Sequence, residues 1–236
     1  MTPIADSISA TQPVVILGGF LISDSAYGPM AAWIQAQTGA EVRIVQANRL
    51  DWLATSWSFG WIRLLDRVDA CVQALQAESE TGRVTLIGHS SGGVMLRAYL
   101  SDQAFLGRTY TGATRCNRLI TLGSPHQAVR ATPLRALVDQ RFPGCPQANQ
   151  VDYVAIAGRL DLNGANASRF SRRTAANSYR QIAGDSQAPG DGLVPVSSAL
   201  LRDARCVELE DTAHGGFFGR SWYGSKERIG RWWSAL

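Results

Sequence analysis

Short apolar segments rich in β-branched residues alternate with helical patterns along the chain, and this alternation restricts the fold most strongly. The predicted strands are 14–17, 41–45, 84–87, 118–122, 153–157 and 206–209. The predicted helices are 29–37, 61–75, 91–101, 134–138 and 226–233. This order indicates an α/β protein with a mostly parallel sheet of about six strands and helices on both faces. Because right-handed crossovers bring the C-terminal ends of parallel strands to one edge, we expect ligand-binding loops there.

Composition narrows the class of protein. The 236 residues are 45% hydrophobic and 18% charged, which suits a single globular domain over 1–236. The net charge is +4, but the basic residues are scattered, so no nucleic-acid partner is expected. No segment is long and apolar enough for a membrane span. Residues 1–19 lack the basic and apolar regions of a secretory signal, so we expect a cytoplasmic location.

The four cysteines do not form a recognisable metal site or disulfide framework. Cys71, Cys116, Cys145 and Cys206 are far apart and include no CxxC pair. We expect free thiols and no bound metal. A bridge between Cys116 and Cys145 remains an alternative if the protein is exported.

The predicted strand 84–87 runs directly into Gly88-His89-Ser90-Ser91-Gly92, which fits the pattern G-x-S-x-G. A nucleophile between a strand and a helix needs a sharp turn to project its hydroxyl, and the flanking glycines remove Cβ atoms that would clash there. The following helix directs backbone N–H groups and the positive end of its dipole at the site. We therefore predict Ser90 as a nucleophile.

A serine hydroxyl needs a base, and histidine is the usual one near neutral pH. The chain has three histidines. His89 is adjacent to Ser90 and is expected to pack beneath the turn. His214 lies in a glycine-rich loop after the last predicted strand and is the preferred base, with His126 as the alternative.

The base in turn needs a carboxylate that fixes its tautomer. Asp161, Asp185 and Asp191 all follow the fifth predicted strand. Asp191 is preferred because the apolar residues of Gly-Asp-Gly-Leu-Val-Pro can anchor it, while Asp161 and Asp185 remain alternatives.

The negative oxygen that forms during acyl transfer needs two hydrogen-bond donors. The backbone N–H of Ser91 is one candidate. The second is expected from the loop after the first strand, where Gly18 and Gly19 permit close approach, with Phe20 as the preferred donor and Leu21 as the alternative. The same glycines do not form a phosphate-binding pattern.

These pieces together resemble the α/β-hydrolase superfamily. The matching segments are 13–21, 86–93, 119–126, 190–199 and 211–218. More narrowly, the chain is similar to compact lipases and esterases, in pattern like bacterial lipases and the inositol-deacylase class. The resemblance implies an α/β-hydrolase fold without a large cap domain, the roles given above for Ser90, Asp191, His214, Phe20 and Ser91, and no cofactor. Such lipases commonly carry His-Gly before the oxyanion residue, where this chain has Gly18-Gly19, so a hydrogen bond from that histidine is missing.

The expected activity is hydrolysis of a carboxylic ester, with a lipid or other hydrophobic acyl ester as substrate. Leu21, His126, Trp57 and Phe217 are the predicted lining of the substrate pocket, and the aromatic residues also suggest contact with a membrane or lipid surface. An acyltransferase or thioesterase with the same residues is an alternative. A non-catalytic scaffold that binds a lipophilic ligand is a further alternative, and the sequence does not indicate an oligomeric state.

Overall fold

The computed structural model describes residues 12–236, and the predicted lack of a signal sequence therefore falls largely outside the described residues. Its centre is a sheet of six strands in the order β2-β1-β3-β4-β5-β6. The strands are β1 (Val14–Leu17), β2 (Val42–Ile44), β3 (Val84–His89), β4 (Cys116–Leu122), β5 (Asp152–Arg159) and β6 (Arg205–Glu210). All five strand pairs are parallel. The predicted α/β class and the six strands are confirmed.

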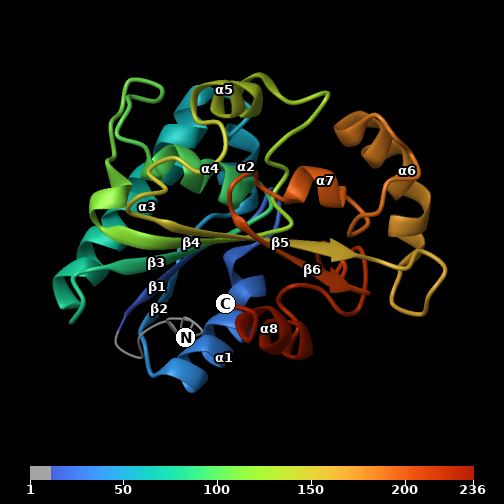
Figure 1. Ribbon diagram of the computed structural model, residues 1–236, viewed down its shortest axis with the longest axis horizontal. Helices are drawn as coiled ribbons and strands as arrows, with labels where there is room; N and C mark the ends of the chain where they lie inside the picture. Colours follow the sequence, from blue (N-terminus) through green and yellow to red (C-terminus); the bar gives the residue numbers. More distant parts are fainter. Residues whose placement is uncertain (1–11) are drawn as a thin grey trace, which may run out of the picture.

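Helices cover both faces of the sheet (Figure 1). The α-helices are α1 (Gly28–Thr38), α2 (Arg49–Ala54), α3 (Ser58–Glu78), α4 (Ser91–Leu100), α5 (Pro133–Arg141), α6 (Arg169–Ala183), α7 (Val196–Ala199) and α8 (Lys226–Trp233). Two 3-10 turns, η1 (Asp24–Tyr27) and η2 (Gly112–Thr114), complete the elements. None of the helices in residues 12–236 combines the length and the apolar character that a bilayer span requires.

The sheet separates two hydrophobic cores. On one face, residues of β1, β3 and β4 pack against α3 and α4, with Leu64, Val68 and Tyr99 fully buried. On the other face, α1 and α8 cover the sheet through Met30, Ile34, Ile229 and Trp232. The strands β3 and β4 therefore lie in the middle of a sheet whose two faces are covered by helices and buried from solvent. This explains their nearly continuous apolar sequences.

Three helices were not expected from the sequence. No helix is among the predicted elements between residues 159 and 195, but α6 occupies the middle of this segment. Its ends follow ordinary capping rules: the Ser168 side chain accepts a hydrogen bond from the Ser171 N–H, and Gly184 adopts a left-handed conformation. Its buried face consists of Ser171, Ala175 and Tyr179. Because two of these three are small and one is polar, the segment lacks the large apolar residues by which the other long helices were predicted.

The other two unexpected helices are short. The helix α2 begins with a capping box between Asn48 and Asp51, and α7 begins directly after Pro195. Helices of six and four residues give too few turns for a periodic pattern.

The direction in which successive strands are added to the sheet changes between β1 and β3. It moves outward from β1 to β2, then returns to place β3 on the other side of β1. Such a switch point leaves a crevice beyond the carboxyl ends of the two strands that flank it, here β1 and β3. The Gly18-Gly19 turn follows β1 and Ser90 follows β3, so both lie at this crevice.

Candidate active site

Ser90 occupies a strained turn between β3 and α4. Its φ of 53° and ψ of −125° are unusual for a residue with a side chain. A Cβ on Gly88 would lie 2.4 Å from the Gly93 Cα, and one on Gly92 would lie 2.3 Å from the Gly18 carbonyl oxygen. The glycines of the G-x-S-x-G pattern are therefore required by close backbone packing, as the sequence predicts.

His214 is the histidine that contacts Ser90. Its Nε2 lies 3.0 Å from the Ser90 Oγ, and both side chains are nearly buried. The loop after β6 carries His214, and its backbone N–H donates to the Asp191 carbonyl oxygen at 2.8 Å. The ring is therefore held both by its side chain and by its backbone.

The alternative base, His126, faces elsewhere. Its Nδ1 accepts a hydrogen bond from Arg97, which leaves Nε2 to donate to the Thr121 hydroxyl at 3.1 Å. Burial lowers its pKa well below the usual range, and the charges of Arg97 and Arg135 lower it further. His126 is thus a neutral, hydrogen-bonded core residue.

Asp191 is fully buried and accepts four hydrogen bonds. Its Oδ2 lies 2.8 Å from the His214 Nδ1 and 2.9 Å from the Tyr223 hydroxyl. Its Oδ1 accepts the backbone N–H groups of Leu193 and Val194. With both oxygens occupied, the carboxylate orientation is fixed toward the imidazole.

The alternative carboxylates make only local contacts. Asp161 accepts the N–H of Asn163, and Asp185 accepts the N–H of Gln187. These bonds to a residue two positions ahead are turn-forming interactions. The structure therefore brings Asp191 to His214 and leaves Asp161 and Asp185 in turns.

A buried hydrogen-bond chain joins the turn after β1 to the His214 loop. The Gly19 N–H donates to the Tyr27 hydroxyl at 2.9 Å, and this hydroxyl lies 2.7 Å from the His89 Nδ1. The His89 Nε2 lies 2.8 Å from the His214 carbonyl oxygen. Since a carbonyl only accepts, His89 carries its proton on Nε2, and Tyr27 donates to Nδ1. Burial, reinforced by the neighbouring His214, lowers the pKa of His89 well below the usual range, consistent with this neutral form.

The hydrogen bonds of Tyr27 and Tyr223 at the site were not predicted from the sequence, in which Tyr27 was considered only as a possible pocket residue. Tyr27 fills the space beside Gly18, where a Cβ would lie 2.5 Å from the tyrosine ring. Its hydroxyl binds the backbone of Gly19, next to the expected oxyanion residue. Neither tyrosine belongs to a local pattern, because each is brought to the site by tertiary packing alone.

The turn after β1 lies against the nucleophile. A Cβ on Gly19 would be 2.7 Å from the Ser90 Cβ, so only glycine allows this approach. Phe20 follows it and lines the same cavity as Ser90, Ser91 and His214. Leu21 has a φ of 61° and is 41% exposed.

A cavity of about 500 Å³ lies over Ser90 and His214. Its wall is mostly apolar and includes Trp61, Met95, Ile182 and Phe218. Elements α3, α4, α5 and α6 contribute to it, so the unexpected helix α6 forms part of the site.

The predicted pocket residues Leu21, His126, Trp57 and Phe217 are not among the lining residues, which corrects their placement. Trp57 is 60% exposed and stacks on Phe59, while Phe217 is 78% exposed. His126 is buried and lines a neighbouring cavity. Sequence position placed these residues near the correct edge of the sheet, but their side chains point to solvent or into the core.

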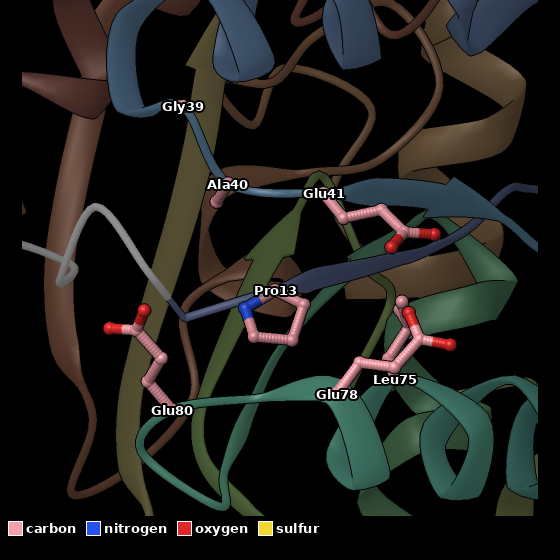
Figure 2. A pocket seen from close by; sticks show the side chains of 7 residues that line it. All are labelled: Pro13, Gly39, Ala40, Glu41, Leu75, Glu78 and Glu80. Atoms are coloured by element: carbon pink, nitrogen blue, oxygen red, sulfur yellow. The ribbon is translucent and has the colours of Figure 1, made fainter.

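A further cavity, with an acidic wall, lies at the opposite edge of the sheet. Figure 2 shows Glu41, Glu78 and Glu80 around Pro13, which precedes β1. Within residues 12–236, no group of three His, Cys, Asp or Glu side chains is arranged to hold a metal ion. The four cysteines are free thiols, so Cys116 and Cys145 do not form a bridge.

The parallel sheet, the turn at Ser90 and the loops that meet at its edge define the fold of an α/β hydrolase. A family model described as palmitoyl protein thioesterase matches residues 13–181. The chain belongs to the palmitoyl protein thioesterase family. The matched range includes Ser90 and ends before Asp191 and His214.

Solved structures support the fold. The mature form of lipase BlEst2 from Bacillus licheniformis is 16% identical, with a TM-score of 0.59 over 90% of this chain and 88% of that chain. Its propeptide form gives a TM-score of 0.61 at 16% identity over 98% of this chain and 52% of that chain. The chain thus spans about half of the propeptide form. No curated protein sequence matches significantly. The protein is a hydrolase of the α/β-hydrolase class.

Proposed function

We propose that the protein hydrolyses hydrophobic acyl esters through Ser90, His214 and Asp191. The observation that carries this proposal is the continuous contact from the Ser90 Oγ through the His214 ring to the buried Asp191 carboxylate. These contacts lie in an apolar cavity large enough for an acyl chain.

In this mechanism, the Ser90 Oγ attacks the acyl carbonyl carbon while the His214 Nε2 takes its proton. Asp191 holds the Nδ1 proton and stabilises the resulting imidazolium. Backbone N–H groups of Ser91 and Phe20 receive the negative oxygen of the tetrahedral intermediate. His214 then protonates the leaving group, an acyl-enzyme remains, and His214 activates the water that releases the acid.

A thioester is a second candidate substrate, favoured by the family to which the chain belongs. The same serine mechanism cleaves both bonds, because only the leaving group changes. Parallel assays of S-acyl and O-acyl substrates with matched chain lengths would decide which bond is preferred.

The test of the mechanism is the Ser90→Ala variant, assayed with p-nitrophenyl esters and acyl thioesters of increasing chain length. Removing the nucleophile should reduce kcat by about 10⁴-fold or more. A fluorophosphonate probe should label the wild type and Ser58→Ala, an exposed control serine, but not Ser90→Ala. Turnover by Ser90→Ala at the wild-type rate would refute the mechanism.

We further propose that the protein meets its substrate at a lipid surface. The α2–α3 segment exposes four large apolar side chains, Leu50, Leu53, Trp57 and Phe59, which we call the α2–α3 apolar patch. Thr55, Ser56 and Trp61 of the same segment line the active-site cavity. A segment that lines the cavity and exposes apolar side chains suits a substrate delivered from lipid.

A further inference from the structure

Arg135 lines the active-site cavity without any partner. It is the third residue of α5 and shares the cavity wall with Ser90 and His214. Within residues 12–236, its guanidinium makes no hydrogen bond or ion pair, and its Nε is buried and unbonded. Burial lowers the pKa of Arg135 below its usual value, and no neighbouring carboxylate opposes this shift.

An arginine in this position is unfavourable in the free protein. Arg135 is partly buried, and its Nε has lost contact with water without gaining an acceptor, which carries a desolvation penalty. The first turn of a helix adds to this penalty, because the positive end of the helix dipole repels a cation. Packing therefore gives no reason for the charge.

The carboxylate whose sequence position would best allow an ion pair with Arg135 does not form one. Asp139 lies one helical turn further along α5, where an ion pair is often found. Its Oδ1 instead approaches the buried Arg97 at 3.9 Å. Arg97 also donates to the Phe142 carbonyl oxygen and to His126 through its two terminal nitrogens, while its Nε is buried and unbonded. Unlike Arg135, Arg97 therefore has partners for its terminal nitrogens.

The active-site cavity has no negative charge of its own. Among the described residues that line it there is no Asp or Glu, and Arg135 is the one Lys or Arg side chain. An anion that enters this cavity would gain a guanidinium partner and meet no carboxylate in the wall. The rest of the wall is apolar, which strengthens such a pairing.

We propose that Arg135 binds an anionic group, a carboxylate or phosphate, carried by the substrate. The preferred substrate is then an acyl ester or thioester with a negative charge at a distance from the scissile carbonyl. This inference rests on the proposed function for the position of the carbonyl at Ser90. Arg135 acts as a specificity residue, because it recognises a part of the substrate that does not react.

Two substrate pairs separate the possible positions of the anion. The p-nitrophenyl monoester of glutaric acid, compared with its methyl-capped form, places a carboxylate on the acyl side. An S-acyl phosphopantetheine, compared with the S-acyl pantetheine, places a phosphate on the leaving-group side. The free energy of a hydrogen bond to a charged group corresponds to about a ten- to hundredfold preference for the charged substrate over the neutral one. We expect this ratio in kcat/KM for one of the two pairs, mainly through a lower KM of the charged substrate.

The variants are Arg135→Gln and Arg130→Gln. Arg130 is an exposed neighbour that lines only the adjacent cavity, so its variant controls for the loss of one positive charge. Arg135→Gln should reduce the anion preference, the ratio of kcat/KM for the charged and neutral member of a pair, to about twofold or less. Arg130→Gln should keep the preference. A structural role would lower the Tm of Arg135→Gln, whereas we expect the Tm to stay the same or rise.

Binding to the Ser90→Ala variant separates this proposal from the proposed function. Calorimetry of the four compounds with Ser90→Ala and with Ser90→Ala/Arg135→Gln measures recognition without turnover. An anion preference that requires Arg135 in binding, together with no hydrolysis by the wild type, would refute only the serine mechanism. Equal affinity for the charged and neutral members of both pairs would overturn the role of Arg135.

Discussion

At the residue scale, Tyr27 has no role in the proposed reaction but holds two loops of the candidate active site through its hydroxyl. Its hydroxyl accepts from Gly19 and donates to His89, which in turn holds the His214 carbonyl oxygen. A single phenol therefore fixes both the turn after β1 and the loop that carries the proposed base.

We predict that Tyr27→Phe weakens both stability and turnover. The variant leaves the Gly19 N–H and the His89 Nδ1 buried without partners, which should lower the free energy of unfolding by about 1–3 kcal/mol. Displacement of the turn should lower kcat about tenfold, equivalent to about 1.4 kcal/mol in the barrier.

The matched control is Tyr110→Phe, which removes a phenol that bonds to Asp66 away from the site. It should reduce stability without a change in kcat. Urea unfolding and steady-state kinetics of both variants provide the comparison. If Tyr27→Phe kept the full kcat, the hydrogen-bond chain would have no role in positioning.

The contacts of Asp191 lead to a second prediction at this scale. Asp191→Asn keeps the size of the side chain but removes the charge that stabilises the imidazolium and selects its tautomer. We expect kcat to fall by about 10²- to 10⁴-fold, with a smaller change in KM. Asp161→Asn, which changes only a turn, should keep wild-type kinetics. Equal losses in the two variants would assign no special role to Asp191.

At the element scale, the turn between β3 and α4 depends on backbone contact that only glycine permits. Gly92→Ala would place a methyl group 2.3 Å from the Gly18 carbonyl oxygen, so β1 and α4 must separate. We expect a loss of more than about 3 kcal/mol in the free energy of unfolding, or no folded protein. Gly28→Ala, where a Cβ meets nothing within 4 Å, is the control and should keep or raise the Tm. A Gly92→Ala protein with wild-type Tm would contradict this account of the turn.

The α2–α3 apolar patch leads to a prediction about surfaces. Trp57→Ser combined with Leu53→Ser should reduce co-sedimentation with phosphatidylcholine vesicles severalfold, because less apolar area enters the lipid. Hydrolysis of a short soluble ester should stay the same. Val129→Ser, which changes an exposed aliphatic residue on another segment, should not affect vesicle binding. Vesicle binding that is unchanged in the double variant would exclude this patch as the contact.

Elements were predictable where a local pattern determined them. The strands β1, β3, β4 and β5 follow from apolar runs that are mostly buried, while β2 and β6 follow from short apolar runs that stay partly exposed at the sheet edges. The helix α8 follows from Ile229 and Trp232 on one face. The contacts among Ser90, Asp191 and His214 could be predicted from the sequence. The G-x-S-x-G motif identifies the serine, and only a few Asp and His residues lie in loops at the correct edge of the sheet. The helix α6 was missed because Ser171 and Ala175 pack as small residues, and the pocket lining was missed because side-chain direction depends on tertiary packing.

At the scale of the whole molecule, two buried histidines link stability to pH. Burial lowers the pKa of both His89 and His126, reinforced by the charge of His214 for the first and by those of Arg97 and Arg135 for the second. The folded state therefore keeps both rings neutral, while the unfolded chain takes up protons below about pH 6.5. Stability should fall as the pH is lowered through this range, by up to about 1.4 kcal/mol per pH unit for each ring.

Urea unfolding between about pH 7.5 and 5 measures this slope. His126→Gln can still accept from Arg97 but does not titrate, so its slope should be smaller than that of the wild type by up to the contribution of one ring. An identical slope in the variant would show that His126 does not contribute.

The hydrogen bond from Tyr223 to Asp191 also determines when, during synthesis of the chain, the site can be completed. During synthesis the nucleophilic serine emerges 124 residues before the histidine that contacts it, and the tyrosine that steadies the carboxylate comes 32 residues after that carboxylate. A nascent or truncated chain therefore displays an inert hydroxyl. Stalled chains that end before Tyr223 should therefore not cleave a chromogenic ester, because Asp191 then lacks one of its four hydrogen-bond donors.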